Sequence, residues 1–129
     1  MLYNTRWENS ETKKIYQATM NSQILMEYLE ETLMQRNLVS LIGEQPSPKR
    51  GYGVIIYYYS KNPKKRLLSS APRKNHDHIH IVLFNNVLSV EQLQNTGFDL
   101  GNTTSDVKIH SKSEIDILVN LLKTNLQKI

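Results

Sequence analysis

Three histidines occupy alternate positions in the segment His76-Asp77-His78-Ile79-His80-Ile81-Val82. Residues i and i+2 of a β-strand lie on the same face, so a strand over residues 78–84 would place His78 and His80 together, roughly 7 Å apart along the strand. Two imidazoles at that spacing can converge on one divalent cation or on one phosphate group. The segment therefore predicts a metal or anion site. The alternative is that both histidines are ordinary surface residues of a half-buried strand.

A fourth histidine, His110, ends the short alternating segment Asp106–His110. The second and fourth residues of this segment are apolar, so Asp106, Lys108 and His110 should share the face on which His78 and His80 lie. In the strand order that we expect, one strand separates His80 from His110, which puts their backbones about 10 Å apart. The candidate metal ligands are His78, His80 and His110, with Asp106, His76 and Gln17 as other candidates for the third group and Mg²⁺ or Mn²⁺ as the cofactor.

These histidines require a sheet with one face left open. The chain of 129 residues is long enough for a single domain covering residues 1–129. Its patterns predict the order strand, helix, strand, strand, helix, strand, helix. This order favours an α+β fold of the ferredoxin-like split βαβ type, an antiparallel sheet with helices packed on one face. The expected elements are a strand over Lys14–Met20, a helix from Asn21 or Ser22 to Asn37, strands over Gly51–Ser60, His78–Phe84 and Asp106–His110, a short helix from Ser89 to Gly97, and a last helix behind Ser113.

Two helices carry apolar stripes that should face the sheet. In the first helix Glu30 is expected on the outer face, and in the last helix a capping box begins at Ser113. Leu38–Ile42 is ambiguous between a strand and a helix tail, and Gln45–Pro48 is expected to be a loop. The expected stripe residues are Leu25, Tyr28, Leu29 and Leu33 in the first helix and Ile115, Leu118, Val119, Leu122 and Leu126 in the last.

Positive charge is concentrated in one part of the chain. No Asp or Glu occurs from Gln45 to His76, a segment that holds eight of the sixteen Lys and Arg residues, whereas the remainder holds all twelve acidic residues. Such a distribution favours a polyanion as partner, although a basic loop can also serve solubility alone. Pro63 and Pro72 predict a basic loop or arm over residues 61–75. The candidate nucleic-acid-binding residues are Lys49, Arg50, Lys61, Lys64, Lys65, Arg66, Arg73 and Lys74.

Three consecutive tyrosines extend the expected strand over Gly51–Ser60. If Val54, Ile56 and Tyr58 point to the core, Tyr57 and Tyr59 point outward beside the histidines. Exposed aromatic rings next to Lys and Arg form a platform on which unpaired bases stack. Tyr57 and Tyr59 are therefore candidate contacts for single-stranded nucleic acid, unless they only cover apolar surface.

The amino-acid composition indicates the cellular compartment in which the protein is expected. The chain has no cysteine, which excludes a disulfide framework and a thiolate metal site. No apolar run reaches membrane-spanning length, and residues 1–11 lack the apolar core of a signal peptide. We therefore expect a cytoplasmic protein without a membrane partner.

The segment His78-Ile79-His80-Ile81-Val82-Leu83 resembles the motif of the HUH endonucleases, which include rolling-circle replication initiators, plasmid relaxases and single-domain tyrosine transposases. The resemblance implies a ferredoxin-like sheet whose histidine pair holds a divalent metal. It also implies a tyrosine that attacks a single-stranded DNA phosphodiester, with the metal acting as a Lewis acid. By this resemblance the protein would be a metal-dependent DNA endonuclease or strand transferase of replication or of a mobile element.

The nucleophile motif of that superfamily is not matched. Replication initiators carry Tyr-x-x-Lys on a helix after the histidine strand, but here Asn120-Leu-Leu-Lys123 has Asn in the tyrosine position, and all seven tyrosines fall at or before Tyr59. Asn cannot form a phosphotyrosine link, so the protein either lacks nicking activity or uses an earlier tyrosine in the relaxase order. Tyr16, on the first expected strand, is then the candidate catalytic residue.

Other functions remain open from the sequence. A non-catalytic nucleic-acid binder needs only the basic residues, and a viral or plasmid interaction or inhibitor module could dock on a host protein through its open sheet or edge strand. The histidine spacing also resembles the motif of histidine-triad nucleotide hydrolases, although Asp77 stands where those require an apolar residue. A metal-independent RNase could instead use two histidines as acid and base.

Overall fold

The computed structural model describes residues 19–47, 52–72, 76–84, 87–100 and 106–127. Within these ranges the chain forms three helices and six strands. In chain order they are α2 (Met20–Gln35), β1 (Val39–Ser47), β2 (Tyr52–Tyr59), β3 (Arg66–Pro72), β4 (Ile79–Leu83), α3 (Val90–Thr96), β5 (Asp99–Leu100), β6 (Asp106–Ile109) and α4 (Lys112–Gln127).

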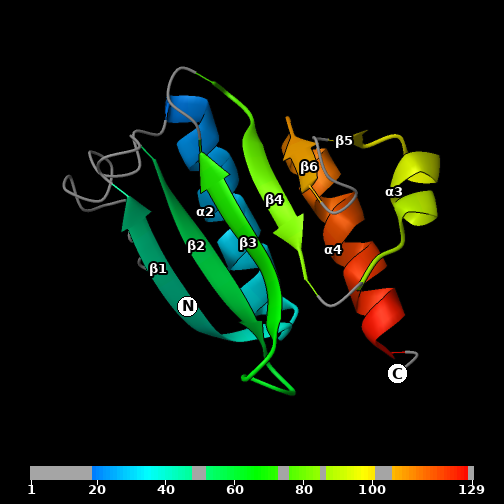
Figure 1. The fold of residues 1–129 in the computed structure, drawn as a ribbon. Coiled ribbons are helices and arrows are strands. Elements are labelled where there is room, and N and C mark those ends of the chain that lie inside the picture. Colours follow the sequence, from blue (N-terminus) through cyan, green and yellow to red (C-terminus); the bar gives the residue numbers. More distant parts are fainter. Residues whose placement is uncertain (1–18, 48–51, 73–75, 85–86, 101–105, 128–129) are drawn as a thin grey trace.

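The six strands form one sheet in the order β1-β2-β3-β4-β6-β5, and each neighbouring pair is antiparallel (Figure 1). Strands β1 to β4 follow one another as an uninterrupted meander, and β6 then pairs with the far side of β4. The predicted α+β class with an antiparallel sheet is confirmed. The ferredoxin-like connectivity is not confirmed, because four consecutive strands are joined here without an intervening helix.

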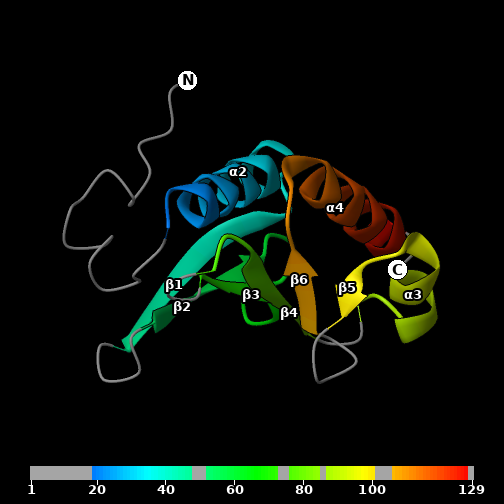
Figure 2. The ribbon, with the colours of Figure 1, turned by 90° about the horizontal axis from the view of Figure 1, so that it is seen from above.

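Helices α2 and α4 lie side by side on one face of the sheet, as Figure 2 shows. Their apolar stripes pack against inward-facing strand residues to form the main core. The stripe predicted for α4 is buried at every position, from Ile115 to Leu126. In α2 the buried apolar residues are Leu25, Met26, Leu29 and Leu33, whereas Tyr28 is only half-buried. Among the described residues no helix is both long enough and apolar enough to cross a membrane.

The ends of the helices differ from the prediction by one to three residues. The N-cap of α2 is Thr19, whose hydroxyl accepts a hydrogen bond from the amide of Ser22. Met20 therefore begins a helix and does not end a strand; residues 14–18 of that predicted strand lie outside the described residues. At α4 the hydroxyl of Ser111, not of Ser113, accepts from the third helical amide, that of Glu114. The cap of α3 at Ser89 and its end at Gly97 are as predicted.

The segment 61–75 is not a projecting arm throughout. Its first five residues form the turn between β2 and β3, but Arg66–Pro72 is a strand in the interior of the sheet, buried at every position after Arg66. The prediction failed because proline and basic residues flank a short apolar run, and the run was read as part of the loop. Likewise β1 continues through Pro46, where a loop was predicted, since the residues from Gln45 to Ser47 still pair with β2.

The phase of β2 is opposite to the predicted one. Ile55 and Tyr57 face the helices, and Tyr57 is 0% exposed. Tyr57 donates a hydrogen bond to Glu30 of α2, which is itself buried, so the expectation that Glu30 lies on an outer face was also wrong. Alternation then places Ile56 and Tyr58 on the other face. A run of apolar residues without polar alternation gave no sequence signal for this phase.

Candidate functional site

Strand β4 presents its histidines on the face that the helices leave uncovered. Ile79, Ile81 and Leu83 are buried and belong to the core between sheet and helices. The intervening residue His80 is half-buried on the opposite face, where its side chain meets that of His78. The predicted alternation of the strand is therefore confirmed, with isoleucine on one side and histidine on the other.

His78 and His80 form a close pair. Their Nε2 atoms lie 3.2 Å apart, and their ring centroids are separated by 5.0 Å. In the absence of a cation, this contact requires one Nε2 to carry a proton that the other accepts. Two ring nitrogens bound to one cation at about 2.0–2.1 Å with tetrahedral angles lie roughly 3.3–3.4 Å apart, close to the observed separation.

His110 stands directly across from His78. Strand β6 pairs with β4 without an intervening strand, in the register Ile79 opposite Ile109. The expected separation of about 10 Å was therefore wrong, and the centroid of the His110 ring lies 5.2 Å from that of His78. The His76 ring lies 5.1 Å from the His78 ring on another side. All four histidines of the chain (His76, His78, His80 and His110, hereafter the histidine cluster) thus gather around His78.

Two carboxylates lie beside rings of the histidine cluster. Oδ2 of Asp99 lies 2.9 Å from Nε2 of His110, and this hydrogen bond lowers the pKa of Asp99. Oδ1 of Asp106 lies 3.5 Å from Nδ1 of His80, on the side of the ring remote from His78. A carboxylate on one ring nitrogen fixes the tautomer of an imidazole and leaves the other nitrogen for a cation. Asp99 was not predicted; its signal was present only in the pairing of β5 with β6.

Burial and neighbouring imidazoles keep His78 neutral. Removal of water from the ring lowers the pKa of His78, and the nearby His80 and His110 lower it further because a second positive charge would be repelled. A neutral imidazole is the form that binds a metal ion. The environment of His78 therefore favours the ligand form at neutral pH.

The chain before β4 is tied to the start of α2. The side-chain amide of Asn21 donates to the carbonyl oxygen of Asp77 at 2.9 Å, and the hydroxyl of Thr19 donates to that of His76 at 3.4 Å. These bonds hold the backbone that carries His76 and His78 against a helix end. The cluster is thus positioned by three elements, the amino-terminal end of α2, β4 and β6.

The histidine cluster supplies only part of a set of metal ligands. Among the described residues, no group of three or more His, Cys, Asp or Glu side chains is arranged so that it could hold a metal ion. The pair of Nε2 atoms is the part that already has ligand spacing, and imidazole nitrogen is a common ligand for divalent transition metals. His110 lies next to this pair, with its ring centroid 5.2 Å from that of His78, and its Nε2 is hydrogen-bonded to Asp99.

The basic residues of the β2–β3 turn lie at the other end of the sheet. Lys61, Lys64 and Lys65 are exposed there, and Arg66 lies over the ring of Phe84 at 5.7 Å. The seven residues of β3 separate this turn from the histidine cluster by roughly 20 Å, at about 3.3 Å per residue. The structure does not bring these two predicted features together. The other predicted residues, Lys49, Arg50, Arg73, Lys74 and Tyr16, lie outside the described residues.

The tyrosines do not form the predicted platform. Tyr57 is buried against α2, and Tyr59 is half-buried and packed against the core. Both therefore face the helices, contrary to the expectation that they stand beside the histidines. Asn120 lies on α4, across the sheet from the histidine cluster, where its side-chain oxygen accepts from Nη1 of Arg36. The position that matches the tyrosine of replication initiators is thus remote from the histidine pair.

We compared the chain with models of protein families, with curated proteins and with solved structures. No family model matches this chain, and neither a curated protein nor a solved structure matches it.

Proposed function

We propose that this protein binds a divalent cation through His78 and His80 and uses the site to engage the phosphate backbone of single-stranded DNA, as a relative of the HUH-type replication and mobilisation proteins. The observation that carries the proposal is the 3.2 Å separation of the two Nε2 atoms on the helix-free face of the sheet. His110 is the third ligand because β6 places it across from His78. Mg²⁺ and Mn²⁺ are the cations to test.

The chain's own residues supply the orientation of the site. Asp99 holds Nε2 of His110 by a hydrogen bond, and Oδ1 of Asp106 lies 3.5 Å from Nδ1 of His80, so a carboxylate stands beside one nitrogen of each ring. A divalent cation bound there would polarise a phosphate oxygen as a Lewis acid. The neutral state of His78 favours binding without loss of a proton at neutral pH.

Cleavage is a second step of the proposal and needs a nucleophile. Tyr57 is excluded as the nucleophile because it is buried. The hydroxyl of Tyr28 donates a hydrogen bond to Oδ1 of Asp116, between the two helices. Tyr16 is the candidate because it lies three residues before Thr19, and Thr19 contacts the backbone of His76. Without a reactive tyrosine the protein would bind DNA and leave it intact.

The first experiment measures Mn²⁺ binding by electron paramagnetic resonance with the full chain. The wild-type protein should bind Mn²⁺ saturably, and the double variant His78→Ala/His80→Ala should lose at least about tenfold in affinity. The matched control is His76→Ala, which removes an exposed ring of the same cluster and should retain most of the binding. Equal binding by the wild-type protein and the double variant would refute the metal site.

The second experiment tests DNA directly. Wild-type protein, the double histidine variant and Tyr16→Phe are incubated with single-stranded DNA and Mn²⁺, and the products are separated under denaturing conditions. A covalent adduct that disappears in Tyr16→Phe would support nicking. Binding without an adduct would reduce the function to DNA binding, and the absence of any DNA binding would overturn the proposal.

A further inference from the structure

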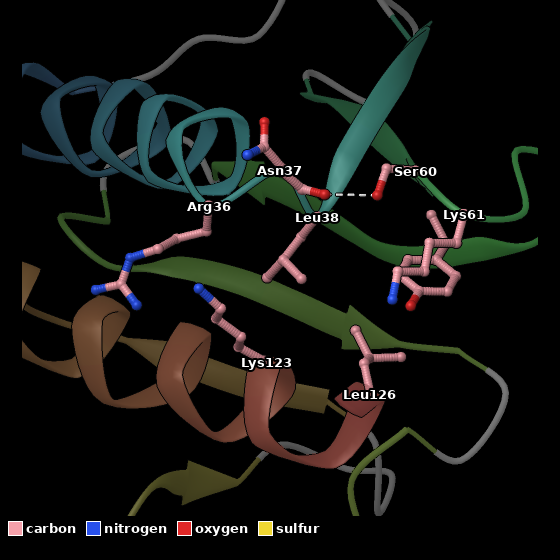
Figure 3. A pocket seen from close by; sticks show the side chains of 8 residues that line it. Arg36, Asn37, Leu38, Ser60, Lys61, Lys123 and Leu126 are labelled. Carbon is pink, nitrogen blue, oxygen red and sulfur yellow. Dashed lines mark hydrogen bonds between the residues drawn. The ribbon is translucent and has the colours of Figure 1, made fainter. Parts of the chain in front are cut away.

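A hollow of about 150 Å³ opens where α2, α4 and β2 end, at the opposite end of the molecule from the histidine cluster (Figure 3). Its walls are apolar at Leu38, Tyr59 and Leu126. Three cationic side chains line it, namely Arg36, Lys61 and Lys123, and none of its described lining residues is acidic. A hollow with this charge selects anions.

The cations come from three different elements. Arg36 caps the carboxyl end of α2, Lys123 lies in the last turns of α4, and Lys61 follows β2 in the turn to β3. Nη1 of Arg36 donates to Oδ1 of Asn120 at 2.8 Å, which holds the guanidinium beside α4. In Figure 3 the side chain of Lys123 extends toward that guanidinium. Arg36 and Lys123 carry like charges on one side of the hollow and repel one another, and a bound anion would offset the repulsion. Lys61 lies on the other side of Leu38 in the same view.

The helix ends explain only part of this arrangement. Cations near the carboxyl ends of helices interact favourably with the helix dipole, and this accounts for Arg36 at the C-cap of α2 but not for Lys123, which lies before the last turn of α4. It does not account for Lys61, which belongs to no helix, or for the hollow between the three. Stabilisation of the helix ends therefore does not explain why Lys61 also lines the hollow.

The floor of the hollow is rigid. The hydroxyl of Ser60 donates to the carbonyl oxygen of Asn37 at 2.5 Å, and the amide of Ser60 donates to the carbonyl oxygen of Leu38 at 2.8 Å. Asn37 has a φ of 58°, the left-handed conformation that turns the chain from α2 into β1. These bonds join the end of α2 to the end of β2, so the backbone at Arg36 and at Lys61 is held together.

We propose that this hollow binds a phosphate monoester. Arg36 would contact the phosphate through its guanidinium, which matches phosphate geometry, and Lys61 and Lys123 would act as point charges. At about 30 Å³ for each water molecule in the liquid, the volume corresponds to about five waters, enough for the five heavy atoms of orthophosphate. The apolar wall suits an organic group attached to the phosphate. Two sources share this chemistry, a free nucleotide and the phosphorylated 5′ end of a DNA strand.

The test uses the full chain and isothermal titration calorimetry with inorganic phosphate at constant ionic strength. Saturable binding is expected, and Arg36→Gln should weaken it by about tenfold because a charge-assisted hydrogen bond is lost. Lys61→Gln lies in a turn, perturbs no helix end and should weaken binding in the same direction. The matched control is Lys112→Gln at the other end of α4, which should bind as the wild type does.

Further arms identify the source of the phosphate and separate this site from the histidine cluster. Tighter binding of a nucleoside monophosphate than of phosphate would identify a free nucleotide. Tighter binding of a 5′-phosphorylated oligonucleotide than of its unphosphorylated form would identify a strand end. The titrations contain EDTA, so that no divalent cation at the histidine cluster contributes to phosphate binding. Absence of saturable binding, or an equal loss in Lys112→Gln, would overturn the proposal.

Discussion

Oη of Tyr57 lies 3.0 Å from Oε1 of Glu30 and donates a hydrogen bond to it from β2 to α2. Both residues are 0% exposed, so this is a polar contact within the layer where the sheet meets the helices. Burial of a carboxyl group is unfavourable unless hydrogen bonds satisfy it. The pair lies on the face of β2 that is turned to the helices and links that face directly to α2.

Replacement of Tyr57 by Phe should lower the free energy of unfolding by about 1–3 kcal/mol, because a buried carboxyl group loses one hydrogen bond while the ring volume is kept. Urea denaturation followed by circular dichroism measures the change. Tyr58→Phe is the matched control, since Tyr58 is half-buried on the other face, and it should change stability by less than about 0.5 kcal/mol. Equal effects of the two changes would contradict the role of the pair.

Stability should fall as the pH is lowered through the range in which His78 titrates. Its pKa in the folded protein is lowered from the ordinary value of 6.5 by burial and by the neighbouring histidines. Below pH 6.5 the unfolded chain therefore binds more protons than the folded one, and the free energy of unfolding decreases toward acid until the folded-state pKa is passed. His78→Gln should flatten this dependence between pH 7.5 and pH 5. The measurement is the urea midpoint at each pH, and an unchanged slope in the variant would contradict the assignment.

Asp99 also makes stability fall toward acid, in a lower pH range. Its pKa is lowered mainly by the hydrogen bond from His110, so the stabilisation that it provides is present above the ordinary carboxyl pKa and lost as the pH falls further. The pH dependence of His78 begins below its ordinary pKa of 6.5 and that of Asp99 only below 3.8, so the interval from pH 7.5 to pH 5 reports on His78 and not on Asp99.

Nucleic-acid binding, if it uses the β2–β3 turn, should depend on salt through the exposed lysines of that turn. Replacement of Lys64 and Lys65 by Ala should reduce the slope of log affinity against log salt by about 1.4, since each phosphate contact on a single strand contributes about 0.7. Fluorescence anisotropy with a labelled oligonucleotide at several salt concentrations gives the slope. Lys112→Ala, at the start of α4, is the control for loss of charge alone. A double variant with the wild-type slope would show that this turn does not contact the phosphates.

Substitution of Gly97 by Ala should destabilise the protein by about 1 kcal/mol, because its φ of 87° is a left-handed conformation that only glycine adopts readily. No atom lies within 4 Å of the added methyl group, so backbone strain alone would account for the loss. Gln94→Ala, an exposed change in the preceding helix, should have an effect below about 0.5 kcal/mol. If both variants unfold at the same denaturant concentration, the conformation of Gly97 carries no measurable strain.

The sequence predicted best those features that rest on strict local periodicity. The stripe of α4 and the alternation of Ile79 and Ile81 with His80 required no knowledge of tertiary structure. The uniform apolar run of β2 carried no alternation, and its inward face contacts Glu30, a residue that helical periodicity had placed outside. The arm over residues 61–75 was mispredicted because the apolar residues of β3 are few and flanked by lysines, and only pairing with β2 and β4 makes them a strand.

The residues of the candidate site also differ in how far the sequence alone predicted them. His78 and His80 could be placed on one face from their spacing alone, whereas the proximity of His110 depends on β6 pairing directly with β4. Asp99 joins the site through a two-residue strand, which is too short to leave a pattern in the sequence. The local sequence pattern therefore predicted the central pair, His78 and His80. The side chains around this pair depend on which strands are neighbours in the sheet.

Alternation along β4 also separates two kinds of evolutionary constraint. Ile79 and Ile81 belong to the packed interior, while His78 and His80 meet on the opposite face. If the proposed cation site is correct, a change at either histidine would alter ligand chemistry and leave the isoleucine packing in place. Carboxylates at these positions would then move the preference toward hard cations and thiolates toward soft ones, so the strand would be a scaffold on which cation preference could be changed without replacing core residues.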